Sequence, residues 1–471
     1  MCGVLGIYGN EGVFAEILSG LNTIQHRGQD SAGIVTLKGI FHIKKGLGLV
    51  NEVFRDGSVL PGKCGIGHVR YATQGSTGLE NAQPFTVNYP FGLAMAHNGN
   101  VTNFEALRHS LSQDHHRLLE TTSDIELIAY QMVLALEKRD LHKLSPTDIF
   151  EAIQEVQKTV EGAYAVVAVI AGFGLLGFTG PHGIRPLLLG RKGQNYAITS
   201  ETTTLDYLGY ELVHEFEGNE SVFIDKNREL YLSKGQASKP AFCVFESIYF
   251  AREDSRFKNR LVAAQREALG RLLAKHFTRE GLKPDIIIDV PSSSYFCAQG
   301  IAEELGIPLR RGLVKNNYIG RSFIAHGQKQ REKLVKQKHN AISEIIKDKR
   351  IAVVDDSIVR GTTAKHIVGL LKQRGAKEVY FVSASPQLKH PCVYGIDVSE
   401  KEMILSERTV EDVRKLIGAE ALIYPTLEDL YEVFPKNKHC AACFSGEYPT
   451  RLSSEVFSLA EREKINAGRL E

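Results

Sequence analysis

The first half of the chain alternates short apolar runs with polar turns, which is the pattern of sheet-forming sequence. Apolar or alternating runs predict strands at residues 3–8, 65–71, 93–98, 163–170 and 221–225. Helical periodicity predicts helices at residues 13–25 and 124–138, the second of which follows the cap-like Thr122 and Ser123. We therefore expect residues 1 to about 240 to form sheets covered by helices.

The pattern changes from about residue 255, where strand-like and helix-like segments alternate. Candidate helices at residues 259–280 and 364–374 are interleaved with candidate strands at residues 285–290, 351–354 and 378–383. Such alternation predicts a parallel, doubly wound sheet. Sheets of this kind bind ligands at the carboxyl ends of their strands, so the turns after these strands are the places to look for chemistry.

Composition excludes some classes of function but assigns none. At 471 residues the chain is too long for one hydrophobic core, and its 57 Lys and Arg against 55 Asp and Glu give no pull toward nucleic acid or membrane. The start lacks a leader pattern and no apolar run of about 18 residues follows, so we expect a soluble, cytoplasmic protein. In that compartment the seven cysteines indicate chemistry or metal before disulfides.

The second residue of the chain is a cysteine with unusual potential. Removal of Met1 would leave a thiol and a free α-amine on Cys2. These groups titrate near pKa ~8.5 and ~8, so the residue would be a nucleophile that carries its own base. The alternative is an incidental cysteine in a poorly ordered terminus.

The sequence VVDDSIVRGTT at residues 353–363 is the clearest motif of the second half. An apolar strand delivers Asp355 and Asp356 to its end, where carboxylates can bind ribose hydroxyls or hydrated Mg²⁺. Gly361, Thr362 and Thr363 then lead into a helix whose N-terminus can bind a phosphate. A solvated capping turn is the alternative, and the length of the motif argues against it.

This motif resembles the phosphoribosyl pyrophosphate (PRPP) loop of type I phosphoribosyltransferases. QHRGQDSAG at residues 25–33, GHVRYAT at 67–73, HNGN at 97–100 and TSD at 122–124 are similar to class II, N-terminal-nucleophile glutaminases. With both motif sets in order, nearly the whole chain resembles the amidophosphoribosyltransferases, in their cluster-bearing branch. The resemblance implies an N-terminal-nucleophile αββα sandwich at residues 2–240, a doubly wound phosphoribosyltransferase domain at 255–440 and a C-terminal segment at 441–471.

The resemblance also implies an activity, the transfer of ammonia from glutamine to PRPP. The products would be 5-phosphoribosylamine, glutamate and pyrophosphate, in the first committed step of purine biosynthesis. Cys2 would attack glutamine, Asn98 and Gly99 would form the oxyanion hole, and Arg70 and Asp124 would hold the substrate's carboxylate and ammonium. Singly, each has a plain alternative: a surface ion pair for Arg70, a helix-start acid for Asp124, and a hairpin turn at Asn98-Gly99. His26 and Arg27 are expected to be structural.

The resemblance assigns the second site to the ends of two strands. Asp355 and Asp356 would bind the PRPP ribose and Mg²⁺, with Ser294 as the third position near the metal. The 5′-phosphate would be held by the loop after them, through Ser357, Arg360, Gly361, Thr362 and Thr363. Residues 316–324 and the basic stretch 328–350, with eight Lys and Arg against three Asp and Glu, are expected to form a lid over the substrate.

Four cysteines form a further group. CAAC at residues 440–443 alone would indicate zinc, a redox pair or nothing. With Cys243 and Cys392, Cys440 and Cys443 match the positions that hold a [4Fe-4S] cluster in the cluster-bearing branch, with structural zinc as the alternative. Cys64 and Cys297 are expected to be small buried hydrophobes.

Two other functions can be weighed against the resemblance. A different class II amidotransferase would need a sugar-isomerase or ATP-pyrophosphatase domain where the Asp355-Asp356 loop stands. A regulator that binds PRPP and senses redox state on the same scaffold would have no need of Cys2 with Asn98, Gly99 and Asp124. Family resemblance also implies a homo-oligomer, a homotetramer.

Overall fold

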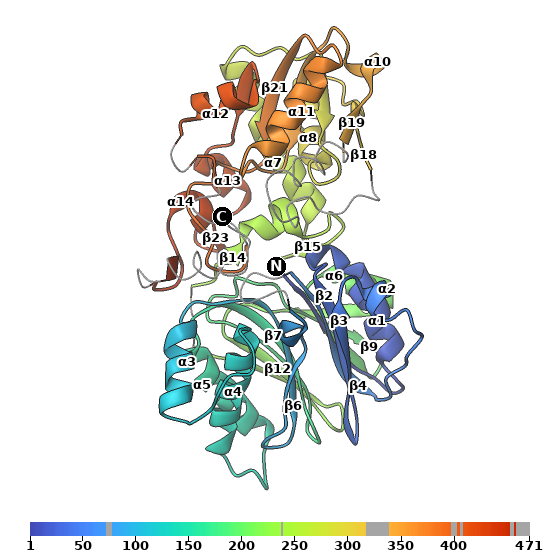
Figure 1. Ribbon diagram of the computed structural model, residues 1–471, viewed down its shortest axis with the longest axis vertical. Helices are drawn as coiled ribbons and strands as arrows, with labels where there is room; N and C mark the ends of the chain where they lie inside the picture. The colour runs from blue at the N-terminus through green and yellow to red at the C-terminus, as the bar shows by residue number, and fades with distance from the viewer. Residues whose placement is uncertain are drawn as a thin grey trace.

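The computed structural model describes residues 1–71, 78–236, 239–316, 339–396, 403–405, 408–452 and 456–457. The chain forms two halves, one above the other, and the N-terminus lies at their junction (Figure 1). The predicted lid at residues 316–324 and 328–350 lies largely outside the described residues. Among the described helices, none combines the length and the apolar character that a membrane crossing requires.

The first half contains two antiparallel sheets. The larger sheet has the order β11 (Glu211–Glu215), β9 (Leu188–Lys192), β10 (Asn195–Thr199), β1 (Gly3–Tyr8), β4 (Cys64–Arg70), β2 (Ser31–Lys38) and β3 (Ile40–Leu47). The second has the order β13 (Leu230–Lys234), β12 (Glu220–Asp225), β8 (Gly174–Thr179), β7 (Gly162–Ile170), β6 (Leu93–Val101) and β5 (Phe85–Val87). The helices of this half are α1 (Phe14–Thr23), α2 (Val50–Val53), α3 (Phe104–Gln113), α4 (Asp124–Glu137), α5 (Pro146–Thr159) and α6 (Thr202–Leu208).

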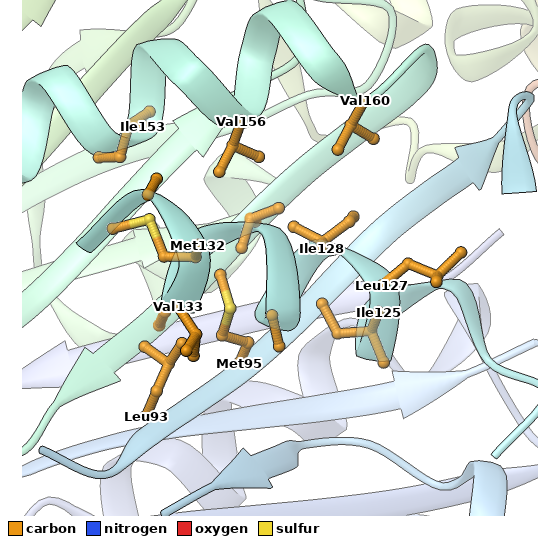
Figure 2. Close-up of a cluster of buried hydrophobic side chains, with 14 of the residues drawn as sticks. Leu93, Met95, Ile125, Leu127, Ile128, Met132, Val133, Ile153, Val156 and Val160 are labelled. Atoms are coloured by element: carbon orange, nitrogen blue, oxygen red, sulfur yellow. The ribbon is translucent and has the colours of Figure 1, made fainter. Parts of the chain in front are cut away.

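These elements form four layers because the strands alternate their apolar faces. In β1, Val4 packs into the core between the two sheets, while Leu5 and Ile7 pack outward against α1 and α6. On the other outer face, α4 and α5 bury their apolar stripes on β6 and its neighbours (Figure 2). The predicted αββα sandwich is therefore confirmed.

The second half is built on a four-stranded parallel sheet. Its order is β17 (Ile286–Asp289), β20 (Arg350–Asp355), β21 (Glu378–Ser383) and β22 (Ala421–Ile423). On β20, Ile351 and Val353 pack against helices α11 (Thr362–Gln373) and α12 (Val410–Ile417). Ala352 and Val354 face the opposite side, against α7 (Val262–Arg279) and α8 (Tyr295–Leu305). Helices on both faces make the sheet doubly wound, as predicted.

Short elements complete the second half and the junction. They are β14 (Phe242–Cys243), a π-helical turn (Glu246–Phe250), β15 (Arg256–Phe257), β16 (Arg260–Leu261), β18 (Leu313–Lys315), β19 (His339–Ala341), α10 (Ser343–Ile346), α13 (Leu427–Val433), β23 (His439–Cys440) and α14 (Ala442–Ser445). β14 pairs in parallel with β23, so the C-terminal part of the chain returns to the junction between the halves.

Most predicted boundaries hold within a few residues, and the differences have local causes. The strand predicted at 93–98 continues as β6 through Val101, because Asn98 and Gly99 stay paired with β7. α3, α5 and α6 lie outside the predicted ranges. The start of α5 was visible in the sequence, since Ser145 and Asp148 form a capping box with Pro146 at the first turn.

Candidate active sites

Cys2 lies directly before β1, and its side chain is buried. Its backbone nitrogen donates to Asn98 Oδ1 at 3.0 Å, and its thiol lies 3.5 Å from the carbonyl oxygen of Tyr71. The β1–β4 register pairs Gly3 with Val69, which brings the preceding Cys2 beside Arg70 at the ends of both strands. Cys2 is thus an ordered, buried residue, and the alternative of a frayed terminal cysteine is wrong.

Asn98 and Gly99 lie within β6, opposite Ala165 and Tyr164 of β7. The hairpin-turn alternative for this pair is therefore wrong. The Nδ2 group of Asn98 is buried and has no hydrogen-bond partner in the part of the chain that the structure describes. Gly99 has φ +152°, and a Cβ on it would lie 1.9 Å from the carbonyl oxygen of Ala163, so only glycine fits. A buried, unpaired amide beside Cys2 is a ready donor for an oxyanion.

Asp124 is the first residue of α4 and is buried. Its Oδ2 accepts the backbone N–H of Val101 at 3.1 Å, and its Oδ1 lies 3.1 Å from His97 Nε2. Burial by itself raises the pKa of Asp124, but His97, the N–H of Val101 and Arg70 outweigh it and hold the pKa below its usual value. Because Asp124 is anionic and Arg70 is cationic, the pocket presents one fixed charge of each sign, which suits a free amino acid.

His97 and Gln83 adjoin the candidate site through contacts that sequence reasoning did not predict. Gln83 Oε1 accepts the backbone N–H of His97 at 2.9 Å, which turns its Nε2 toward His97 Nδ1 at 3.1 Å. Nδ1 is then the acceptor, so the ring proton is on Nε2, facing Asp124 with an alignment too poor for a strong hydrogen bond. The histidine directly before Asn98 was the available signal, whereas nothing in the sequence connects it to Gln83.

A chain of buried charges lies behind Cys2. Arg27 donates from Nε to the carbonyl oxygen of Cys2 at 2.9 Å, from one terminal nitrogen to Glu201 at 2.5 Å, and from the other to both oxygens of Glu246. His26 Nε2 lies 2.8 Å from the same Glu201 carboxylate. His26 and Arg27 thus have the structural setting expected for them, and their acidic partners were not predicted.

The second site lies at the carboxyl ends of β20 and β17. Asp355 ends β20, and its Oδ1 accepts the backbone N–H of Asp356 at 2.9 Å. Asp356 accepts hydrogen bonds from the hydroxyls of Ser357 and Ser293, and burial raises its pKa. Ser294, the predicted third position, instead donates to the carbonyl oxygen of Val290 at 2.7 Å. The neighbouring Ser293 is therefore the serine of this turn that contacts Asp356.

The loop after Asp356 leads through Arg360 into α11, which begins at Thr362 and Thr363. Gly361 caps the helix with φ +73°, and a Cβ on it would lie 2.4 Å from Ile404 Cδ1. Glycine is required there by both the backbone conformation and the space. The first turn of this twelve-residue helix presents unpaired N–H groups and its positive dipole end beside the two carboxylates, as an anion site requires.

Comparison with known proteins covers both halves of the chain. The family described as "Glutamine amidotransferase domain" matches residues 68–207, and that described as "Phosphoribosyl transferase domain" matches residues 261–389. The amidophosphoribosyltransferase of Pseudomonas aeruginosa is 43% identical over 97% of this chain and 94% of its own length. The amidophosphoribosyltransferase of Escherichia coli K12 is 41% identical over 92% of this chain and 88% of its own length. The chain belongs to the amidophosphoribosyltransferase family. A solved structure agrees: the glutamine PRPP amidotransferase from B. subtilis, complexed with ADP and GMP, superimposes with a TM-score of 0.86 at 37% identity, covering 96% of this chain and 98% of that one.

In this member of the amidophosphoribosyltransferase family, the four predicted cluster cysteines come together at the junction. Cys243 of β14 is paired in register with Cys440 of β23, and Cys443 lies in α14. These three cysteines belong to one hydrophobic cluster, and the partly buried Cys392 packs against it. Burial raises the pKa of Cys243 to about 11. The pKa of Cys443 is raised well above its usual value, mainly by burial and to a smaller extent by the three neighbouring thiols.

The metal predictions stay predictions. Within the described ranges, no three or more His, Cys, Asp and Glu side chains are grouped closely enough to hold a metal ion. All seven cysteines are free. Cys64 and Cys297 are buried in apolar surroundings, as expected for small hydrophobic residues.

Proposed function

We propose that the chain transfers ammonia from glutamine to PRPP and so forms 5-phosphoribosylamine, glutamate and pyrophosphate, the first committed step of de novo purine biosynthesis. One observation carries this proposal: a buried cysteine with an unpaired amide donor and a paired-carboxylate phosphate loop lie in one chain of the amidophosphoribosyltransferase family. The proposed domains are residues 2–240 for glutamine and residues 255–440 for PRPP.

The glutamine half performs acyl transfer. The thiolate of Cys2 attacks the amide carbon of glutamine, and Asn98 Nδ2 with the N–H of Gly99 stabilises the oxyanion that forms. Ammonia leaves with a proton, and water then hydrolyses the thioester to glutamate. After removal of Met1, the nitrogen that donates to Asn98 Oδ1 would be the α-amine that carries this proton. Arg70 and Asp124 hold the two charged ends of the substrate.

The PRPP half performs displacement at the anomeric carbon. Residues 357–363 at the start of α11 bind the 5′-phosphate, and Asp355 and Asp356 bind the ribose hydroxyls. The donor set suits Mg²⁺, which prefers oxygen ligands. Two carboxylates lie at the end of one strand, and the hydrogen-bond partners of Asp356 are hydroxyl groups. Asp355 and Asp356, with Ser294 or Ser293 nearby, would hold the ion, which neutralises charge on the departing pyrophosphate.

The cysteine group is proposed to hold a [4Fe-4S] cluster. Three buried thiols and the partly buried Cys392 lie in or against one hydrophobic cluster, and the other three thiols each raise the pKa of Cys443. Four cysteine thiols are a donor set that suits either a cluster or zinc. Iron and acid-labile sulfide should be found in anaerobically purified protein, at four of each per chain. Stoichiometric zinc without iron would contradict the cluster.

Two variants test the assignment of the halves. Cys2→Ala should abolish glutamine-dependent pyrophosphate release and leave the reaction with added ammonia intact. Replacement of Asp355 and Asp356 together by Ala should abolish pyrophosphate release with both nitrogen sources. If the double variant lost only the use of glutamine, the second site would be wrongly assigned. If wild-type protein lacking Met1 formed no glutamate from glutamine in the presence of PRPP, the proposed enzymatic function would be contradicted and the PRPP-binding regulator favoured.

The setting of the enzyme is also proposed. The seven free cysteines support a location of the protein in the reducing cytoplasm. We expect a homo-oligomer, a homotetramer, on the family resemblance alone, and light scattering on the eluting protein measures its mass.

A further inference from the structure

A short segment after β21 rests on the strand that carries Asn98 and Gly99. Asn100 donates from Nδ2 to the carbonyl oxygen of Val393 at 3.0 Å. Two residues further on, a Cβ on Gly395 would lie 3.2 Å from the carbonyl oxygen of Gly99. Residues 393–395 therefore contact both the residue that follows Gly99 and the peptide group of Gly99 itself.

The same segment is tied to Cys2 through buried charges. Arg185 is fully buried and donates from Nε and a terminal nitrogen to the carbonyl oxygen of Tyr394, at 2.9 and 2.5 Å. Its guanidinium also lies 3.3 Å from Glu246, which in turn holds Arg27. Because Arg27 donates to the carbonyl oxygen of Cys2, one continuous set of contacts joins the segment to the nucleophile.

One set of contacts reaches Gly99 and its neighbour Asn100, and the other reaches Cys2. A donor contributes to an oxyanion hole only if it is held at hydrogen-bond distance from the developing charge before the reaction begins. Gly99 is the least constrained backbone in β6, since glycine lacks the steric limits of other residues. Neither Asn100 nor Arg185 has an assigned role toward glutamine, and both instead fix the neighbours of Gly99 and Cys2.

We propose that residues 393–395 form a buttress that holds the oxyanion hole in register with Cys2, with Asn100 and Arg185 as positioning residues. The inference rests on the proposed glutaminase reaction and adds residues to it. It means that the glutamine half reaches its working geometry only with a segment of the second half in place.

Two variants disturb the contact between residues 393–395 and β6. Asn100→Ala deletes the hydrogen bond to Val393, and Gly395→Ala places a methyl group against Gly99 at a residue with φ +107°. Their controls are Asn103→Ala, which deletes a similar bond to Thr159 on the protein surface, and Gly172→Ala, with φ +82° and no atom within 4 Å of the added Cβ. Asn103→Ala loses this bond and also the one that Asn103 Oδ1 accepts from the N–H of Glu161, and Gly172→Ala matches the backbone strain. Neither control touches the oxyanion hole.

The readouts separate positioning from loss of folding. In both buttress variants, kcat for glutamine hydrolysis should fall by about 10-fold to 100-fold, the range expected when a catalytic group is displaced and not deleted. The KM for glutamine should stay unchanged, because Arg70 and Asp124 still bind the substrate. Ammonia-dependent pyrophosphate release should also stay unchanged. So should alkylation of Cys2 by iodoacetamide, a reaction that forms no oxyanion.

The outcomes are distinct. Glutamine kcat at the wild-type level in Asn100→Ala and Gly395→Ala, or an equal fall in the two controls, would overturn the buttress. Loss of ammonia-dependent activity together with glutamine use would also overturn it, because the contacts would then serve folding. Arg185→Lys keeps the charge beside Glu246 but loses the pair of hydrogen bonds to the carbonyl oxygen of Tyr394, and should lower kcat in the same way. A wild-type protein without glutaminase activity would overturn the proposed function as well.

Discussion

Replacement of Asn98 by Ala should remove one of the two proposed oxyanion donors while leaving the rest of the molecule in place. The side chain has two separate roles: its Oδ1 accepts the Cys2 N–H at 3.0 Å, and its buried Nδ2 is unpaired within the described residues. Loss of one oxyanion donor costs roughly 3 to 4 kcal/mol, or 10²–10³-fold in kcat. Loss of the bond to Cys2 adds about 1 kcal/mol, or roughly 5-fold.

The assay compares two nitrogen sources on the same protein. Glutamine-dependent kcat should fall by about 500-fold to 5,000-fold on these figures, while kcat with ammonia should stay at the wild-type level. Asn195→Ala is a matched control, because Asn195 Oδ1 also accepts a backbone N–H, that of Asn10, at 3.0 Å. If Asn98→Ala kept glutamine turnover within about five-fold of wild type, the loss of one hydrogen bond would explain it and Asn98 would not be an oxyanion donor.

Three further results are expected. Asp356→Asn should abolish PRPP use yet raise the melting temperature of the ligand-free protein at pH 7, since burial raises the pKa of this carboxyl. The gain in melting temperature should shrink as the pH falls through the carboxyl's raised folded pKa and be absent below its unfolded pKa of about 4, which differential scanning calorimetry at several pH values measures. Gly361→Ala should raise the KM for PRPP at least 10-fold, because its Cβ meets Ile404 at a left-handed residue. Cys443→Ser should abolish the predicted iron and sulfide content while Cys64→Ser leaves it intact, as metal analysis will show.

Sequence periodicity predicted the strands well where buried apolar residues alternate or run continuously. The strand at residues 3–8 has the predicted bounds, and the alternation in the second half led directly to the doubly wound sheet. The order of strands in the two antiparallel sheets could not be predicted, because pairing between distant strands leaves no local signal. The same reason explains Gln83 and Glu246, which reach His97 and Arg27 across long stretches of sequence.

Local geometry explains the remaining differences at the sites. Ser293 and Ser294 are adjacent in a turn, and only the backbone direction decides which hydroxyl meets Asp356. The motif at residues 97–100 pointed to Asn98 and Gly99, but their place inside a paired strand emerged from the contact with β7. Motif chemistry thus led to the proposed reacting groups, and the packing around them showed which residues contact those groups.

Transfer of labelled nitrogen tests the central claim most directly. Protein lacking Met1 is given glutamine labelled with ¹⁵N in its side-chain amide, together with PRPP and Mg²⁺, and glutamate, pyrophosphate and the phosphoribosyl product are measured in one reaction. We predict one pyrophosphate per glutamate and the label in 5-phosphoribosylamine. Glutamate without pyrophosphate, or a product without the label, would contradict the claim that Cys2 supplies the ammonia used at the Asp355-Asp356 loop.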